Sequence, residues 1–334
     1  MRFTRRPWQS EMPVFFRKTK GKMIFLLNPF RFYITMVGEK PVRKGSGLLF
    51  LPIRAQMNRN GNREGTGIVM RFVSIASGSS GNCIYIGSDN THILIDAGIS
   101  NKRIEKGLSE IGVKGSELDG VFITHEHADH IQGLGILARK YPIPIYGTKE
   151  TLEEIAGKAS LGEYPKELLR PILPDVDFHF GDLQIRPFRI DHDAANPVAY
   201  RVQHGKKSVA VATDLGHYDQ YVIDHLQGLD ALLLEANHDV RMLETGPYPY
   251  RLKQRILGDY GHLSNENCGR LLNCILHDHL KKILLGHLSE KNNFAELAYE
   301  TVCLEITQGE TAYQAKDFSI AVAGRDSLSE IVTV

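Results

Sequence analysis

Short apolar stretches that end at a polar or charged residue recur along the chain from residue 70 onward. The pattern predicts strands at 71–76, 84–87 and 92–95, with a polar turn at 77–82 between the first two. The stretch 121–124 is apolar up to its last residue and is predicted to be a buried strand. Further strands are predicted at 143–146, 183–190, 198–202, 208–212, 231–234 and 282–285.

Apolar positions at helical spacing separate many of these strands. Helices are predicted at about 100–111, 131–140, 218–226, 250–257, 265–277 and 294–306. Strands with few helices come first, and strands with interleaved helices follow, which indicates sheets covered by helices rather than an all-α or all-β domain. We therefore predict one compact α/β domain over residues 70–334.

Charge divides the chain at the same place. Residues 1–69 contain 14 Lys and Arg against 3 Asp and Glu, whereas residues 70–334 contain 26 against 36. With 42% hydrophobic and 24% charged residues, the chain does not belong to the disordered, collagen-like or membrane classes. Its four cysteines form no CxxC pair, which argues against a disulfide-stapled secreted domain and favours a cytoplasmic protein.

The basic leader, residues 1–69, has three interpretations. A targeting or membrane segment is one, but Asn28, Pro29 and Arg31 interrupt its most apolar stretch well short of the ~20 residues that a span needs. A basic arm that binds nucleic acid is the second, although its charges are scattered. The third, which we favour, is an over-extended translation start with Met70 as the native beginning, or else a disordered segment.

Three histidines and two acidic residues follow directly on the predicted strand 121–124, in the sequence His125-Glu126-His127-Ala128-Asp129-His130. Imidazoles and carboxylates are the ligands that suit zinc, manganese or iron. A solvated polar turn would not need this density of histidine, so we predict a metal site at this strand end.

This motif resembles the His-x-His-x-Asp-His signature of the metallo-β-lactamase fold superfamily, and further motifs follow in the family's order across residues 70–334. The resemblance implies a four-layer αβ/βα sandwich of two mixed β-sheets flanked by helices. It makes Asp96 a residue that orients the metal ligands. It also implies seven ligands for two divalent metal ions, zinc or manganese, and these are His125, His127, Asp129, His130, His192, Asp214 and His287.

In such a site the resemblance implies that Asp214 bridges the two ions and that a bridging hydroxide attacks the substrate, with Asp129 among the catalytic residues. This chemistry suits hydrolysis of a phosphodiester or of an activated acyl group. The β-lactamase branch has a cysteine where Asp214 stands, and none of the four cysteines occupies a motif position. The pattern therefore argues against antibiotic hydrolysis.

Glu235 and His262 resemble a pair that handles the proton of the leaving oxygen in tRNase Z and related phosphodiesterases. Glu235 ends the apolar strand 231–234, and His262 precedes the predicted helix 265–277. We expect both to be catalytic. The alternatives are a strand-end carboxylate without a catalytic role and a histidine that caps the helix.

Motifs at 77–82, 212–216, 235–239 and 261–267 are more particular, and on them the chain resembles the YycJ/WalJ (VicX) family. This implies a bacterial metal-dependent nuclease with 5′-to-3′ exonuclease activity on DNA, in repair. Candidate substrate contacts are Ser79, Asn82, Asn237 and His238. A plain hairpin turn at 77–82 and a helix-capping role for His238 remain open.

The resemblance implies DNA rather than RNA as the substrate, yet the body is acidic and phosphate binding normally relies on Lys and Arg. Bound divalent cations reduce this conflict, as do basic residues between 238 and 258, where Tyr248 and Tyr250 offer stacking surfaces. A solvated helix pair is the alternative for that stretch. A tRNase Z-like or small cyclic phosphodiesterase, a glyoxalase-II-like thioesterase and a non-catalytic regulatory protein are the alternative functions. No membrane partner is expected, and the sequence predicts no oligomeric state.

Overall fold

The computed structural model describes residues 69–334 and, before them, the backbone of 15–19, 22–27 and 30–31. The chain divides into two units, Met1–Asn62 and Arg63–Val334. In the first unit, β1 (Phe15–Thr19), β2 (Lys22–Leu27) and β3 (Phe30–Arg31) form an antiparallel sheet. The rest of the leader lies outside the described residues, so its absence from the native protein and its disorder stay predictions.

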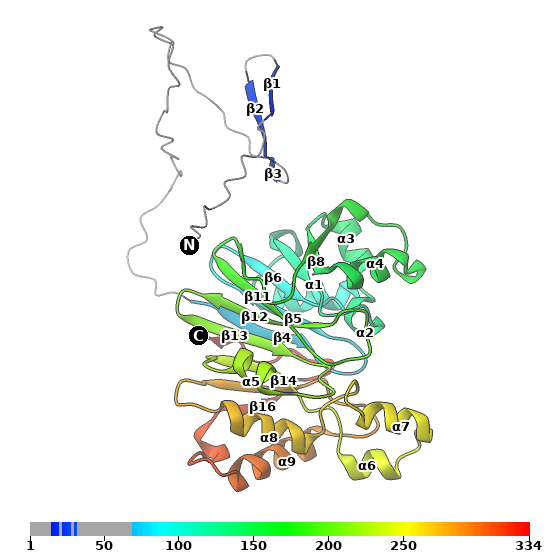
Figure 1. Cartoon of the computed structure of the whole chain (residues 1–334), viewed down its shortest axis with the longest axis vertical. Coiled ribbons are helices and arrows are strands. Elements are labelled where there is room, and N and C mark those ends of the chain that lie inside the picture. Colours follow the sequence, from blue (N-terminus) through cyan, green and yellow to red (C-terminus); the bar gives the residue numbers. More distant parts are fainter. Residues whose placement is uncertain (1–14, 20–21, 28–29, 32–68) are drawn as a thin grey trace, which may run out of the picture. The chain divides into compact units, whose positions relative to one another are not determined.

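The second unit contains two mixed sheets of seven strands each (Figure 1). The first has the order β17-β4-β5-β6-β7-β8-β9. Its strands are antiparallel from β17 to β6 and parallel from β6 to β9. Their bounds are β4 (Arg71–Ala76), β5 (Cys83–Gly87), β6 (His92–Ile95), β7 (Gly120–Phe122), β8 (Ile145–Thr148), β9 (Leu169–Ile172) and β17 (Val332–Thr333).

In the second sheet the strands β10 to β16 lie side by side in the order of the sequence. It is antiparallel from β10 to β13 and parallel from β13 to β16. Its strands are β10 (Phe178–Phe180), β11 (Leu183–Arg189), β12 (Val198–His204), β13 (Lys207–Ala212), β14 (Ala231–Glu235), β15 (Lys282–Gly286) and β16 (Ile320–Val322).

Nine α-helices of the second unit cover or extend these sheets within the described residues. They are α1 (Asn101–Glu110), α2 (Ala128–Ile131), α3 (Leu134–Lys140), α4 (Lys149–Gly157), α5 (Gln220–Leu226), α6 (Val240–Thr245), α7 (Tyr250–Leu257), α8 (Asn265–Ile275) and α9 (Ala295–Gln308). Side-chain caps begin four of them, since Thr148, Asp219, Asp239 and Ser264 each accept from the backbone N–H three residues on.

Three buried apolar clusters set the order of the layers. Both sheets contribute to the middle cluster, for example with Phe72 and Tyr200. A second cluster joins the first sheet to α1, α3 and α4, and a third joins the second sheet to α5, α8 and α9. Strands buried on both faces read as continuous apolar runs, which explains sequences such as that of β14. The predicted αβ/βα sandwich of four layers is confirmed.

The structure corrects several predicted elements. The single helix expected at 131–140 is two helices, because the chain turns at Gly133, whose N–H bonds to Ala97 O. A Cβ on Gly133 would lie 2.0 Å from Ile99 O, so only glycine fits this turn. The strand expected at 143–146 begins after Pro144, at Ile145. The elements β9, β10, β16, β17, α4 and α6 were not predicted.

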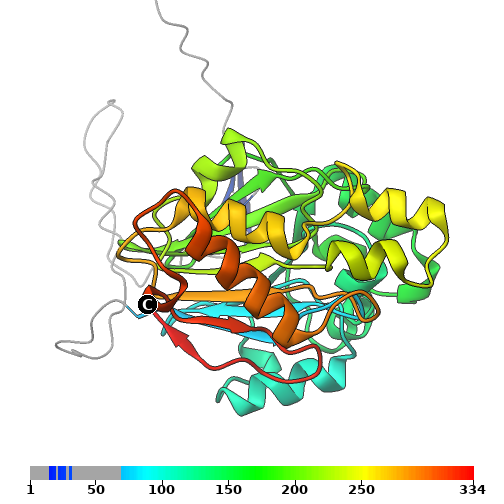
Figure 2. The same cartoon turned by 90° about the horizontal axis from the view of Figure 1, so that it is seen from below.

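Helices α6 and α7 lie at the end of the domain opposite the C-terminus, as Figures 1 and 2 both show in yellow. They come directly after β14, whose last residue is Glu235. Among the described residues, no helix is long and apolar enough to cross a membrane. The arrangement leaves α6 and α7 beside the strand ends at which the chemistry-bearing residues gather.

Candidate metal centre and active site

Three residues at strand ends in this region have a left-handed backbone conformation, which residues other than glycine rarely adopt. Asp96 follows β6 with φ 62°, Asp214 follows β13 with φ 61°, and His287 follows β15 with φ 55°. Strained backbones of this kind cost free energy and concentrate at functional sites. All three were predicted from the sequence as site residues.

Asp96 is fully buried and connects the strand after which it stands to the histidine-rich turn. Its Oδ1 accepts from the Thr124 N–H at 2.8 Å, and its Oδ2 accepts from Thr124 Oγ1 at 2.9 Å and from His130 Nδ1 at 2.7 Å. Because Nδ1 of His130 carries this hydrogen bond, Nε2 is turned toward the other candidate ligands. Asp96 therefore holds the ring of His130, and its predicted role in orienting metal ligands stays a prediction.

Hydrogen bonds fix the tautomers of two further histidines. The hydroxyl of Thr124 donates to Asp96, so it accepts from Nδ1 of His125 at 3.0 Å, and the lone pair of that ring is on Nε2. In the same way Gly261 O accepts from Nδ1 of His192 at 3.1 Å. The ring of His127 lies beside them, its Nδ1 3.3 Å from Nε2 of His192. Three imidazoles thus converge.

Carboxylates complete the cluster on its other side. Asp214 Oδ2 lies 3.1 Å from Nε2 of His130, and its Oδ1 lies 3.7 Å from Nε2 of His192 and 3.5 Å from Nδ1 of His287. Asp129 Oδ2 lies 3.2 Å from Nε2 of His287. Asp214 is thus the carboxylate between the two halves of the cluster, where a bridging ligand was predicted.

Glu235 lies behind the cluster and contacts two of its histidines. Its Oε1 accepts from Nδ1 of His262 at 2.9 Å and from Nδ1 of His287 at 2.8 Å. Its Oε2 accepts from the backbone N–H groups of Leu215 and Leu263. Glu235 has no exposed surface, whereas the side chain of His262 is 20% exposed. Of the predicted pair, only His262 is placed to reach a substrate.

The carboxylates control the protonation of the histidines. Burial alone would lower the pKa of His287, but Asp214, Asp129 and Glu235 outweigh it and raise the pKa to about 10. The pKa of His130 is likewise raised against the effect of burial, by Asp214, Asp96 and Asp129. Burial raises the pKa of Asp214, yet the charges of His287 and His130 hold it well below its usual range. The site is built to attract positive charge.

A divalent cation fits this donor set. Four groups of side chains each present ligand atoms within 4.8 Å of one another: His125, His127 and His192; Asp129, His130 and His287; His125, His130 and Asp214; and Asp214, Glu235, His262 and His287. Nε2 of His125 is buried and has no hydrogen-bond partner, and the buried Oδ2 of Asp214 forms no hydrogen bond although Nε2 of His130 lies 3.1 Å away. Buried polar atoms without partners are rare, and a metal ion would satisfy both.

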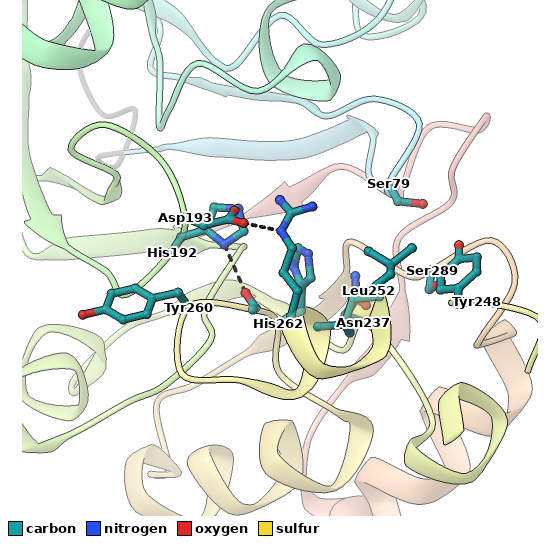
Figure 3. Close-up of a pocket in the computed structure, with 12 residues that line it drawn as sticks. Ser79, His192, Asp193, Asn237, Tyr248, Leu252, Tyr260, His262 and Ser289 are labelled. Atoms are coloured by element: carbon teal, nitrogen blue, oxygen red, sulfur yellow. Dashed lines mark hydrogen bonds and ion pairs between the residues drawn. The ribbon is translucent and has the colours of Figure 1, made fainter. Parts of the chain in front are cut away.

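A cavity of about 160 Å³ opens beside this cluster. His192 and His262 lie on its inner side, and Figure 3 shows Tyr260 and Tyr248 at opposite ends of the group that lines it. Of the candidate substrate contacts, Ser79 and Asn237 line the cavity. Asn82 and His238 are buried and do not line it; Asn82 Nδ2 lies 3.2 Å from Nε2 of His130, and His238 Nδ1 lies 3.3 Å from Asn237 Oδ1.

Sequence reasoning missed three contacts that support the site, although it had included Arg255 among the basic residues expected to help bind phosphate. Thr124 links Asp96 to His125, Ser77 Oγ accepts from the His287 N–H at 2.9 Å, and Arg255 forms an ion pair with Asp193 at the cavity. Thr124 was visible as the last residue of the apolar stretch before the motif. The other two depend on contacts between segments far apart in the sequence, for which a single sequence carries no signal.

Residues 91–282 match the family model of the beta-lactamase superfamily domain. The chain is 38% identical over 267 residues to the exodeoxyribonuclease WalJ of Streptococcus pneumoniae, a match that covers 80% of this chain and 99% of that protein. It is 37% identical over 233 residues to the exodeoxyribonuclease YycJ of Bacillus anthracis, covering 70% and 88%. The metallo-beta-lactamase fold protein YhfI from Bacillus subtilis superposes with a TM-score of 0.56 at 19% identity, over 79% of this chain and 99% of that one.

Proposed function

Because the chain belongs to the beta-lactamase superfamily, and within it to the WalJ/YycJ family, we propose that it is a metal-dependent exodeoxyribonuclease that degrades DNA in the 5′-to-3′ direction. The relatives named exodeoxyribonucleases align along most of their length. We further propose that the chain binds two divalent ions, zinc or manganese. The proposal also includes a cytoplasmic location, which the four free cysteines support.

The observation that carries the proposal is the position of His262 between Glu235 and the cavity. Hydrolysis of a phosphodiester breaks a P–O bond and expels an alkoxide, which is a poor leaving group unless it is protonated or bound to a cation. Glu235 holds Nδ1 of His262 and leaves Nε2 as the nitrogen for a substrate. We assign to His262 the donation of a proton to the leaving oxygen, and to Glu235 the orientation of His262.

The metal ligands proposed are the predicted seven, in two sets. His125, His127 and His192 would hold one ion, Asp129, His130 and His287 the other, and Asp214 would contact both. When bound, the ions would supply a more acidic water and positive charge for the phosphate oxygens. Asp96 and Thr124 orient His130 and His125 for this role. Because Asp129 is partly exposed at the same place, it can also contact the attacking water.

Parallel assays on four substrates test the function. Purified protein is incubated with Mn²⁺ or with EDTA and with one of four substrates: linear DNA, RNA of the same sequence, a cyclic dinucleotide or a glutathione thioester. We expect metal-dependent cleavage of DNA that His262→Ala slows strongly. Preferential turnover of RNA, cyclic dinucleotide or thioester would replace the proposal with the corresponding alternative. A thioester needs no acid for its leaving group, so His262→Ala would hardly affect that activity.

A further inference from the structure

Helix α7 forms one wall of the cavity beside the metal cluster. Leu252, Arg255 and Ile256 line the cavity, and their spacing of three and four residues places them on one face of the helix. Arg251 and Lys253 belong to the same helix and are not among the residues that line the cavity. Of the basic residues of α7, only Arg255 therefore lines the cavity.

Among the described residues that line this cavity, Arg255 is the only Arg or Lys. Its Nε donates to Asp193 Oδ2, and Figure 3 marks this contact with a dashed line from Asp193. Oδ1 of the same carboxylate lies 3.5 Å from Nε2 of His192 and 3.8 Å from Nε2 of His127. The guanidinium is thus held next to the predicted metal ligands.

The ion pair uses only part of the guanidinium. A guanidinium has five N–H donors, and the hydrogen bond described for Arg255 engages Nε. Its side chain is 55% exposed, so the Nη groups remain accessible from the cavity. An arginine held by a carboxylate, with its remaining donors accessible, is suited to bind a phosphate in a fixed orientation.

The other residues of the cavity fit a nucleotide segment. Tyr248 and Tyr260 supply aromatic faces, and Tyr260 is 62% exposed. Ser79, Asn237 and Ser289 supply polar groups to the lining, beside the apolar side chains of α7. Stacking of bases on aromatic side chains combined with cationic contacts to the backbone is the usual way in which single strands are held.

We propose that Arg255 binds a phosphate of the nucleic-acid strand next to the scissile phosphate, and that Asp193 positions its guanidinium. This inference rests on the proposed nuclease function and specifies how the acidic body holds a polyanion. Residues 70–334 contain more acidic than basic residues, so a single cation at the cavity would carry much of the local attraction. Asp193 is a positioning residue in this account, since it acts through Arg255.

The test compares Arg255→Gln and Arg255→Lys with Arg251→Gln, a matched change one turn earlier on the same helix. Steady-state kinetics on 5′-labelled single-stranded DNA in Mn²⁺ are measured together with binding of the same DNA in EDTA by fluorescence anisotropy, over a range of salt. For Arg255→Gln we expect KM and the metal-free Kd to rise about tenfold, with a smaller change in kcat. The slope of log K against log salt should fall by about one.

Arg255→Lys should lie between the wild type and Arg255→Gln, because lysine keeps the charge but not the planar fork. Arg251→Gln should stay within about twofold of the wild type. An Arg255→Gln protein with unchanged KM, Kd and salt slope would overturn the inference. So would a loss confined to kcat with a lower melting temperature, which would make the ion pair a structural contact only. Wild-type protein that binds DNA but never cleaves it would instead contradict the proposed function, since the binding comparison does not depend on cleavage.

Discussion

The buried carboxylate of Glu235 lies 2.9 Å from Nδ1 of His262, and the imidazole separates it from the cavity. Oε1 of Glu235 also accepts from Nδ1 of His287 at 2.8 Å, and its Oε2 accepts from two backbone N–H groups. Four hydrogen bonds fix this carboxylate in place. Glu235 thus connects the candidate proton donor to a candidate metal ligand without itself facing a substrate.

His262→Ala should lower kcat for DNA hydrolysis by about 10²–10⁴-fold, the usual contribution of a positioned general acid. Metal content should not change, because His262 is outside the proposed ligand set. Glu235→Gln should also lower kcat for DNA hydrolysis. If the two residues act as a pair, the double variant loses little more than His262→Ala alone. Multiplicative losses in this double-mutant cycle would show that the residues act independently.

Asp96→Asn should weaken metal binding by about 10–100-fold, since the carboxylate that orients His130 and Thr124 is removed. Competition against a chromogenic chelator measures the affinity. Asp119→Asn is the matched control, because Asp119 also accepts a backbone N–H, from His92, but lies outside the site. Equal affinities for the wild type and Asp96→Asn would contradict the orienting role.

Gly98→Ala should destabilise the domain and weaken the metal site together. A Cβ there would lie 1.7 Å from Asp129 O and 2.8 Å from Asn82 N, both backbone atoms that cannot move aside independently. Overpacking of this kind costs about 1–3 kcal/mol or more. Gly157→Ala, at the end of α4 with nothing within 4 Å of the new Cβ, should be neutral or stabilising by up to about 1 kcal/mol. Chemical denaturation of both variants checks the difference, and equal stabilities would contradict the close packing at Gly98.

Removal of metal should lower Tm. Without a cation, the negative charges of Asp129, Asp214 and Glu235 lie close together in buried or partly buried positions, where they lack the positive charge of the metal. A ligand present at 1,000 times its Kd stabilises the folded state by about 4 kcal/mol. We expect EDTA to lower the Tm of the wild type and to have little effect on Asp214→Ala. Identical melting curves with and without EDTA would contradict a metal site of useful affinity.

Much of the site could be predicted because its residues stand in motifs that resemble those of the family, and these motifs follow apolar strands directly. Asp96, Asp214 and His287 each stand one or two residues after a buried strand, and parallel strands deliver such residues to one edge of a sheet. The elements that were missed have weak patterns. Strand β9 contains Arg170 and Pro171 and lies at a sheet edge, and β17 has two residues.

Contacts between distant segments could not be predicted. Arg255 and Asp193 are 62 residues apart, and Ser77 and His287 are 210 apart. Each pair meets only because the sheets and α7 bring the two segments together. Whether Asn82 and His238 face a substrate also depends on side-chain direction, and both are buried and do not line the cavity.

The most direct test of the account follows the products released over time from 5′-labelled linear DNA in Mn²⁺, by the wild type and by Asp214→Ala. The account predicts that the wild type releases labelled mononucleotides from the earliest time points and leaves covalently closed circular DNA intact. Asp214→Ala, which lacks the carboxylate between the two halves of the cluster, should release none. Wild-type protein that cuts the strand internally, or that leaves it intact in Mn²⁺, would contradict the account, as would unchanged cleavage by Asp214→Ala.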